Sequence, residues 1–484
     1  QEVPIEGNFR NLAYFYVDVF VGTPPQRFSV IADTGSTLLA FPCKGCASCG
    51  SQQHKFDVSA SSSCAAVPCG SPVCSGCSGG HCTYRQAYAE GSSINGVYYS
   101  DLLWLGDDST NGQGFEEFAV SYQFGCHSAE TKLFKTQLAD GIMGLSQSSK
   151  ALVTTLAHTG VIPSHIFSMC LSLDGKGTFT LGGVDEGLHQ GTLAYTPMTS
   201  STSFYTVTVD AVTFDGATTL DASKFNTGSH TIVDSGTSFT YVPSGMFNQL
   251  KSSITTYCAA SGKCKGTKMT VQYESLCYRL SHASDLATFP SLALRLAGGV
   301  SINLPPSKLF INMAWDNGAY CLGVYSNGGS GAVIGANAMM DYDVVFDVAH
   351  RRIGFAPSTC TYVSGVSAAS PSSSPVASPS STAAASPSFS KSPAASTSAS
   401  TSPAASTSPA ASSTPQASPS PTASKSLGAS ASATASVAAT PSSSPAESPS
   451  SSPAVSPSSS PAAAAEGIDA AEPSSTPTGA NSSS

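Results

Sequence analysis

Short segments in which apolar and polar residues alternate dominate the first three quarters of the chain. They are rich in Val, Phe, Tyr and Thr and are separated by Gly, Pro, Asn and Asp, a pattern typical of half-buried β-strands. The clearest such segments are 13–22, 27–33, 96–105, 116–125, 177–183, 204–214 and 343–356. Only 148–160 and 244–260 begin near a Ser and space their apolar residues as a helix does. The pattern predicts a mostly β protein with few, short helices.

The periodicity disappears in the last quarter of the chain. Residues 364–484 are almost entirely Ser, Ala, Pro and Thr, which offers too little apolar surface to offset the entropy of ordering the chain. We expect a disordered tail that serves as an O-glycosylated spacer. Residues 1–363 would then form the folded part.

Charge and cysteine content narrow the classes of protein that fit. The formal net charge of −9 argues against nucleic acid as a partner. All 15 cysteines precede the tail, and this density favours the oxidising secretory pathway and a framework of disulfides.

The two ends of the chain bear on localisation. No apolar run reaches the length that spans a bilayer, and the N-terminal residues lack the pattern of a signal peptide. The chain stops at small polar residues without an apolar tail. We expect a mature protein of the secretory pathway, extracellular or at the cell surface, with membrane attachment through a removed C-terminal lipid-anchor signal. An endomembrane compartment is one alternative location. A soluble secreted form and a chain cut before a membrane helix are the alternatives.

One phrase occurs twice in the folded part. It reads VIADTGSTLLAF at 30–41 and TIVDSGTSFTYV at 231–242. Each copy is followed later by two apolar residues and a Gly, at 142–144 and 333–335. A single acid of this kind is usually a capping Asp in a turn, but chance turns do not explain a matched pair. The repetition indicates two similar halves that each contribute one acid.

The two acids, Asp33 and Asp234, suit a particular chemistry. Two carboxyl groups held within about 3 Å do not both ionise easily and share one proton. The ionised group then takes a proton from a water molecule, and the protonated group polarises a peptide carbonyl. We expect Asp33 and Asp234 to be catalytic in peptide hydrolysis that uses no metal or other cofactor.

The residues after each acid are expected to support it. Thr34 and Ser235 would form hydrogen bonds between the two halves and hold the loops rigid. The other four would act on the acids directly: Ser36 and Thr237 by bonding the outer carboxylate oxygens, and Gly35 and Gly236 by allowing close approach of the backbone.

These motifs together resemble those of the pepsin-type aspartic proteases, over essentially all of residues 1–363. The resemblance rests on DTGS and DSGT in that order and on the later pairs of apolar residues followed by Gly. It also rests on VGTPPQ before the first acid and YAEGS after it. It implies a monomer with a bilobal β-fold, a central cleft and protein or peptide substrates. The lobes would be 1–190 and 191–363, with a β-hairpin flap at 84–99. Tyr88 matches the flap tyrosine that orients water and substrate.

The sequence departs from the family pattern at one position. Pepsin-like enzymes usually have a Trp seven residues after the first catalytic acid, where it braces the flap tyrosine. Here that position is Ala40. We therefore expect a roomier entrance and a less firmly braced flap.

An insertion at 43–82 contains eight cysteines. Its CxxCxxC start also suits tetrahedral zinc, but the scattered remaining cysteines favour disulfides. The insertion resembles the nepenthesin-like branch of the pepsin family and, more closely, the plasmepsin V type. If that pattern transfers, the bridges are Cys43–Cys46, Cys49–Cys126, Cys170–Cys360 and Cys277–Cys321. An odd total leaves at least one cysteine unpaired or bonded to another chain.

The same resemblance implies a substrate preference. Enzymes of the plasmepsin V type cut after the Leu of Arg-x-Leu motifs in exported proteins, and a flap Glu and a nearby Gln receive the Arg. Glu90 matches the first residue and Gln137 the second. The alternative is that Glu90 is simply solvated.

Two other classes of protein compete with a protease. A catalytically inactive binding or inhibitor protein on the same fold would most simply lack an acid or a loop, and both are intact here. In a cell-wall or adhesion protein, the tail would carry the main function and the folded part would be accessory. The composition of the tail fits a spacer better.

Overall fold

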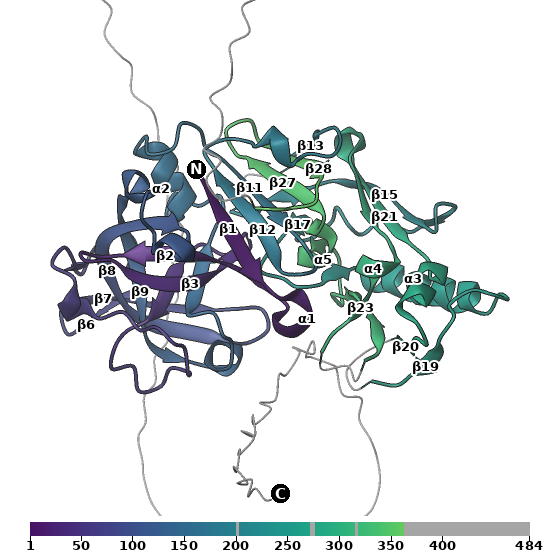
Figure 1. Ribbon diagram of the computed structural model, residues 1–484, viewed down its shortest axis with the longest axis horizontal. Coiled ribbons are helices and arrows are strands. Elements are labelled where there is room, and N and C mark those ends of the chain that lie inside the picture. Colours follow the sequence, from purple (N-terminus) through teal and green to yellow (C-terminus); the bar gives the residue numbers. More distant parts are fainter. Residues whose placement is uncertain (200–202, 272–275, 315–317, 363–484) are drawn as a thin grey trace, which may run out of the picture. The chain divides into compact units, whose positions relative to one another are not determined.

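The computed structural model describes residues 1–199, 203–271, 276–314 and 318–362, and Figure 1 shows their arrangement. This part of the chain is mostly β, as predicted. Both predicted helices are present, as α2 (Leu152–His158) and α3 (Ser244–Cys258), beside the one-turn helices α1 (Phe9–Leu12), α4 (Pro306–Leu309) and α5 (Ala336–Met339). The predicted disordered tail lies outside the described residues. Within them, no helix has the length and apolar character needed to cross a membrane.

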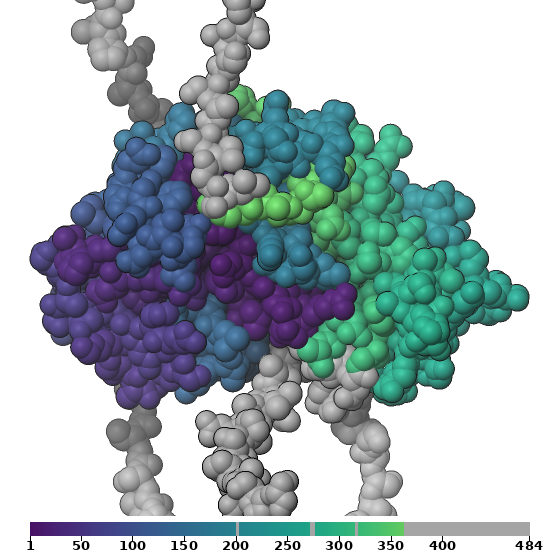
Figure 2. Space-filling view, viewed as in Figure 1, coloured from purple at the N-terminus to yellow at the C-terminus, as the bar shows by residue number. Residues whose placement is uncertain are grey.

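One 15-stranded sheet runs through the molecule. In spatial order its path is β13 (Ala194–Pro197), β28 (Arg352–Pro357), β27 (Tyr342–Asp347), β11 (Ile166–Leu171), β12 (Lys176–Leu181), β1 (Glu2–Gly7), β2 (Phe15–Val21), β3 (Gln26–Asp33), β10 (Gly141–Gly144), β4 (Leu39–Pro42), β9 (Val120–Glu130), β8 (Ser93–Gly106), β7 (His81–Ala87) and β6 (Gly76–Ser78), and β5 (Ala65–Ala66) pairs with β8. In its middle, β27 pairs with β11 and β12 pairs with β1. Strands from both ends of the described chain therefore lie close together, and Figure 2 shows their purple and light green surfaces in the same region.

Three smaller sheets complete the fold. The first contains β14 (Thr206–Val207), β17 (Thr231–Val233), β26 (Ala332–Ile334), β18 (Thr240–Val242) and β25 (Val324–Ser326). The second contains β16 (Thr218–Leu220), β15 (Val209–Phe214), β21 (Leu292–Leu296) and β22 (Ser301–Leu304). The third contains β19 (Thr267–Met269), β20 (Cys277–Arg279), β24 (Tyr320–Leu322) and β23 (Phe310–Asn312).

The repeated phrases form the same local topology twice. In the first copy β3 lies parallel to β10, and β10 is antiparallel to β4, which pairs in parallel with β9. In the second copy β17, β26, β18 and β25 repeat these relations in the same order. Each acid lies at the end of its strand, beside the strand that contains the later apolar segment, β10 or β26. Gly144 lies opposite Asp33, and Ile334 lies opposite Val233. The later apolar segments noted in the sequence are thus the strands that flank the two acids.

A cluster of phenylalanines packs on β3, the strand that carries Asp33, and on the neighbouring strands β4 and β9. The rings of Phe28 and Phe41 stack with centroids 4.2 Å apart, and Phe56 and Phe124 pack edge to face at 5.1 Å. All four side chains are at most 1 % exposed. Burying an aromatic ring of this size contributes about 1.5–3 kcal/mol. The strand that carries Asp33 therefore has little freedom to move.

Seven disulfides join 14 of the cysteines and leave Cys64 as a free thiol. The seven pairs are Cys43–Cys126, Cys46–Cys49, Cys69–Cys77, Cys74–Cys82, Cys170–Cys360, Cys258–Cys264 and Cys277–Cys321. The preference for disulfides over a zinc site in the insertion is therefore confirmed. Two of the bridges that the family resemblance implied, Cys170–Cys360 and Cys277–Cys321, are among them.

The pairings Cys43–Cys46 and Cys49–Cys126 were wrong. The partners are exchanged because β4 runs beside β9, with Phe41 opposite Cys126. Cys43, just after β4, is thereby brought to a Cα distance of 5.1 Å from Cys126, within the range that a disulfide requires. Cys46 and Cys49 then close a short turn with a Cα distance of 5.5 Å.

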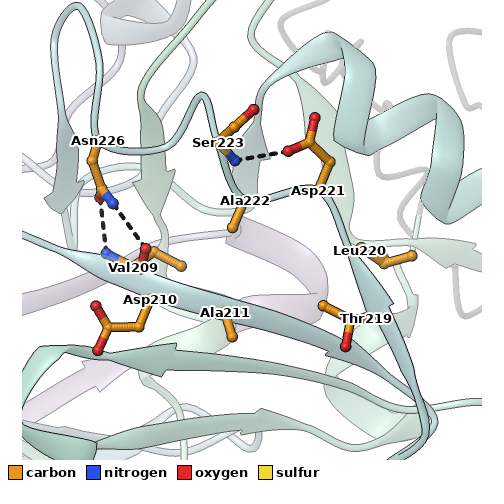
Figure 3. A pocket seen from close by; sticks show the side chains of 9 residues that line it. All are labelled: Val209, Asp210, Ala211, Thr219, Leu220, Asp221, Ala222, Ser223 and Asn226. Carbon is orange, nitrogen blue, oxygen red and sulfur yellow. Dashed lines mark hydrogen bonds between the residues drawn. The ribbon is translucent and has the colours of Figure 1, made fainter.

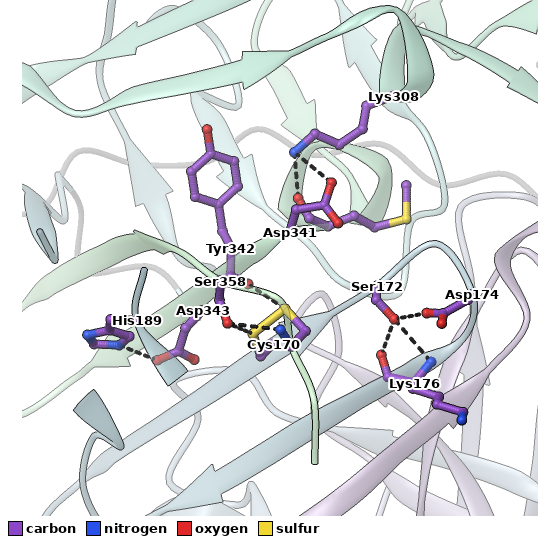
Figure 4. The surroundings of a disulfide bond; sticks show 12 residues. Cys170, Ser172, Asp174, Lys176, His189, Lys308, Asp341, Tyr342, Asp343 and Ser358 are labelled. Carbon is purple, nitrogen blue, oxygen red and sulfur yellow. Dashed lines mark hydrogen bonds and ion pairs between the residues drawn. A yellow bond between two sulfur atoms is a disulfide. The ribbon is translucent and has the colours of Figure 1, made fainter. Parts of the chain in front are cut away.

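The Cys170–Cys360 bridge ties the middle of the chain to its last described residues (Figure 4). Around it, His189 Nε2 lies 2.9 Å from Asp343 Oδ2, and the buried Lys308 ammonium donates a hydrogen bond to the carbonyl oxygen of Met340 at 2.5 Å. Burial lowers the pKa of Lys308 to about 8. Apart from the buried Oδ1 of Asp343, which has no hydrogen-bond partner among the described residues, these polar groups bond within the protein, so we assign them a structural role.

Candidate active site

The two acids stand at the ends of buried strands. Asp33 is the last residue of β3, and Asp234 directly follows β17. Apolar residues before each acid hold the strand in the core, whereas the Gly and hydroxyl residues after it favour a turn. Only 5 % of Asp33 and 8 % of Asp234 are exposed. Each turn therefore presents one carboxyl group that is almost removed from water.

The hydrogen bonds to the two carboxyl groups match. Within the first loop, Gly35 N donates to Asp33 Oδ1 at 2.9 Å and Ser36 Oγ donates to Asp33 Oδ2. The equivalent bonds of the second loop run from Gly236 N to Asp234 Oδ1 at 3.0 Å and from Thr237 Oγ1 to Asp234 Oδ2 at 2.7 Å. Hydrogen bonds to both oxygens fix the plane of each carboxyl group.

A reciprocal set of hydrogen bonds joins the two loops. Thr34 N donates to Ser235 Oγ at 3.0 Å, and Ser235 N donates to Thr34 Oγ1 at 2.9 Å. Each hydroxyl also donates across the junction, Thr34 to Val233 O at 3.0 Å and Ser235 to Ala32 O at 2.7 Å. Both residues are at most 2 % exposed. Four buried hydrogen bonds therefore hold the two acids in register.

The glycines of the loops face the acid of the opposite loop. A Cβ atom added to Gly35 would lie 2.5 Å from Asp234 Oδ2, and one added to Gly236 would lie 2.1 Å from Asp33 Oδ1. Both distances are far below van der Waals contact. Gly is thus required at both positions for the acids to face each other.

The environment of Asp33 favours its protonated form. Burial, and after it the neighbouring carboxyl group of Asp234, raise the pKa of Asp33 well above its usual range. The hydrogen bonds from Ser36 and Gly35 act in the opposite direction. A buried pair of this kind can hold one proton between two acids near neutral pH.

The raised pKa predicts a pH-dependent gain of stability in Asp33→Asn. Since the folded-state pKa lies above the unfolded value near 4, the native state of the wild type is destabilised as the pH rises through the folded pKa. The amide cannot ionise, and it can still accept a hydrogen bond from Gly35. We expect the Tm of the variant minus that of the wild type to increase between pH 4 and pH 7, measured by calorimetry. A difference that stays constant with pH would contradict this account of the pair.

The predicted flap is a hairpin formed by β7 and β8. Its turn is closed by Tyr88 N donating to Ser92 O and Gly91 N donating to Tyr88 O, both at 2.9 Å. Burial, followed by the nearby Asp33 carboxyl group, raises the pKa of Tyr88 well above its usual range. The tyrosine hydroxyl is therefore within electrostatic range of the first acid.

The packing contradicts the expectation of a weakly braced flap. Although Ala40 leaves no ring at the usual position, the ring of Phe134 packs against that of Tyr88 with centroids 5.0 Å apart. One edge of the flap hairpin is also bonded, since β9 pairs with β8 as far as Ile94 and Glu130, whereas β6 pairs with β7 only at 81–83, before the flap. The brace therefore comes from a different part of the chain.

The two predicted substrate-binding residues lie on neighbouring segments. Glu90 is in the flap turn, where its Oε1 accepts a hydrogen bond from Ser92 Oγ. Gln137 follows the 3-10 helix η4 (Lys132–Lys135), and its side-chain amide donates to Ala139 O at 3.1 Å. Both side chains are partly exposed. The flap and η4 are connected through Thr131, whose hydroxyl accepts from Ser93 N at 2.8 Å.

Three residues behind the flap were not predicted from the sequence: Phe134, His127 and Glu130. They contact one another or the flap, as described below, yet they belong to β9 and the segment that follows it. The i, i+3 spacing of His127 and Glu130 is visible in the sequence, but alternation along a strand does not show that both face the interior. Only the pairing of β8 with β9 reveals their position.

The pocket drawn in Figure 3 is not lined by either of the two acids. It has a volume of about 490 Å³ and is lined by residues of β15, β16 and the loop that follows, including Asp210 and Asp221. Asn226 satisfies the backbone of Val209 with two hydrogen bonds of 2.8 and 2.9 Å. None of the residues predicted for catalysis lines it, so we give it no part in the chemistry.

Most of the chain is similar to known proteins. Residues 14–358 match the family described as "Eukaryotic aspartyl protease". The chain is 31 % identical to Aspartic protease 5 of Toxoplasma gondii over 73 % of its own length and 37 % of that protein's length. It is 30 % identical to Aspartyl protease AED1 of Arabidopsis thaliana and 24 % identical to Plasmepsin V of Plasmodium falciparum (isolate 3D7), covering 72 % of each. The chain thus spans little more than a third of the first of these relatives.

Proposed function

Since the chain belongs to the eukaryotic aspartyl protease family and is an aspartic-type endopeptidase, we propose that Asp33 and Asp234 are its catalytic pair. The observation that carries this proposal is the matched pair of buried carboxyl groups joined by the Thr34 and Ser235 hydrogen bonds. Two acids in equivalent surroundings can exchange the roles of base and acid during one reaction.

The reaction needs one proton shared by the two acids. The ionised carboxylate accepts a proton from the attacking water, which then bonds to the carbonyl carbon of the scissile peptide. The other carboxyl group donates its proton toward the developing oxyanion. Collapse of the tetrahedral intermediate transfers a proton to the leaving nitrogen. Tyr88 would cover this site from the flap, because its hydroxyl lies near Asp33 and Ser36.

We further propose that the enzyme processes secreted or exported proteins at Arg-x-Leu-like sites. Glu90 lies two residues after Tyr88, and its carboxylate also contributes to the raised pKa of that tyrosine, which supports a position beside the substrate. A carboxylate can accept two parallel hydrogen bonds from a guanidinium, whereas an ammonium group cannot reproduce that geometry. Gln137 would assist from the neighbouring segment.

Secretion is supported by the disulfides. Seven bridges in one folded unit require an oxidising environment to form and persist. We place the enzyme in the secretory pathway, with an extracellular or cell-surface destination.

Substitution of Glu90 tests the specificity. Glu90→Ala is expected to lower kcat/KM for Arg-x-Leu peptides about ten- to a hundredfold, since a charge-assisted hydrogen bond contributes about 1.5–3 kcal/mol. Peptides with norleucine in place of Arg should change little. The measurement is the kcat/KM ratio of the two peptides, and a mixture of diverse peptides shows whether the wild type selects Arg at all.

Glu117→Ala serves as the matched control, because Glu117 is an exposed glutamate of the same lobe outside the flap. It should leave the ratio unchanged. Equal losses for both peptides in Glu90→Ala, or a wild type without preference for Arg, would remove the proposed specificity and leave a general aspartic endopeptidase.

A further inference from the structure

The flap tyrosine is supported from behind by an aromatic cluster. Phe134, which is 4 % exposed, contacts Tyr88 with its ring tilted by 42°. The space beside Ala40 is filled by Tyr84, since a Cβ atom added to Gly125 would lie 2.7 Å from the Tyr84 ring and 2.9 Å from the Ala40 Cβ. Phe134, from the segment after β9, and Tyr84, from the flap strand β7, thus belong to one buried cluster against which Tyr88 packs.

A buried polar network fixes the position of Phe134. The side-chain amide of Gln52 donates to the carbonyl oxygen of Phe134 and, at 2.9 Å, to Glu130 Oε2. Glu130 Oε2 also accepts from Gly50 N at 2.9 Å, while its Oε1 lies 2.8 Å from Nδ1 of His127. The ring of His127 meets Phe134 edge to face at 6.3 Å. The network therefore touches Phe134 at both its backbone and its ring.

Four polar atoms of this region are buried without a hydrogen-bond partner among the described residues: Gln52 Oε1, His127 Nε2 and the hydroxyls of Tyr84 and Tyr88. The rings of His127 and Tyr84 are only 6.3 Å apart. Burial lowers the pKa of His127, which favours the neutral ring. A neutral ring that donates from Nδ1 to the Glu130 carboxylate has Nε2 as an acceptor, and the hydroxyl of Tyr84 is the matching donor.

We propose that His127 is a positioning residue for Tyr88 and that it acts through one buried water molecule bound between its Nε2 and the hydroxyl of Tyr84. A buried donor and a buried acceptor rarely remain unpaired, and a water molecule with such partners is an ordinary part of a protein interior. The bound water joins the histidine, Tyr84 and Phe134 into one rigid support for the flap. This inference rests on the proposed role of Tyr88 over the two acids.

Removing either partner should lower turnover without weakening substrate binding. Tyr84→Phe and His127→Phe are each expected to reduce kcat about five- to tenfold, the size expected for one hydrogen bond, while KM stays within twofold. The double variant should lose no more than the more affected single variant, because both partners hold the same water. Additive losses, or an unchanged kcat in both single variants, would overturn the proposal.

Tyr98→Phe is the matched control. Tyr98 is a tyrosine of the same cluster, with its ring 5.1 Å from that of Tyr84, and its hydroxyl is not among the buried unpaired atoms. Its kcat should equal that of the wild type. If the histidine variant does not fold, a crystal structure of the wild-type protein decides the question, because the water must lie within hydrogen-bond distance of both atoms; its absence from clear density would overturn the proposal.

Comparing Asp33→Asn with Tyr84→Phe and His127→Phe distinguishes an error in the positioning role from an error in the catalytic assignment. If Asp33→Asn is inactive while Tyr84→Phe and His127→Phe both keep full turnover, only the positioning role is wrong. If Asp33→Asn retains activity, the catalytic assignment itself is wrong.

Discussion

Asp33→Asn and Asp234→Asn are each expected to lower kcat by about 10⁴-fold or more. General acid and general base catalysis each contribute up to about 10⁴-fold, and both depend on the shared proton because neither acid can serve alone as base and acid in one step. An amide at either position can still accept from the glycine N–H of its own loop, so the loops should keep their shape. The decisive measurement is kcat with a fluorogenic peptide.

Controls separate lost chemistry from lost folding. Each variant should unfold in a single transition with a Tm no lower than that of the wild type, as the buried charge is removed. Asp221→Asn, at an exposed acid just after β16, should retain full activity. Normal turnover by either catalytic variant would contradict the mechanism.

Gly236→Ala should lower kcat by roughly a hundredfold or more, although no reacting group is removed. Its added Cβ would lie 2.1 Å from Asp33 Oδ1, so one of the acid loops must shift by about an ångström. Displacements of that size in an active site cost on the order of a hundredfold. The loss should be measured both as kcat and in single-turnover kinetics. Gly35→Ala should behave similarly.

Gly245→Ala is the appropriate control for the glycine series. A Cβ at Gly245 meets no atom within 4 Å, and its position near the start of α3 tolerates Ala. This variant should keep kcat and should be at least as stable as the wild type. If Gly236→Ala turns over within twofold of the wild type, the close approach of the two loops is not needed for catalysis.

The sequence predicted the chemistry of the site better than its surroundings, for a physical reason. Asp33, Thr34 and Ser36 belong to one short phrase, and the second copy repeats it, so a local pattern contains most of the site. The hydrogen bonds that Thr34 and Ser235 make between the loops were expected from that pattern, and the structure contains them.

Contacts that depend on strand pairing could not be predicted in the same way. The exchange of partners among Cys43, Cys46, Cys49 and Cys126 follows from β4 lying beside β9, which no spacing of cysteines shows. Likewise, Phe134 reaches Tyr88 because the flap hairpin pairs with β9. Ala40 indicated correctly that the usual brace is missing, but the replacement comes from a residue nearly a hundred positions later in the chain.

The pairing of β11 with β27 has a consequence for how the protein is made. During synthesis, Cys170 emerges 190 residues before its partner Cys360, a delay of roughly 10–40 s at ordinary translation rates. The bridges of the cysteine-rich insertion span at most 83 residues and can close earlier. Throughout this interval the nascent chain carries an unpaired strand edge and an unpaired thiol, so we expect its folding to depend on chaperones and thiol oxidoreductases until its last strands are translated.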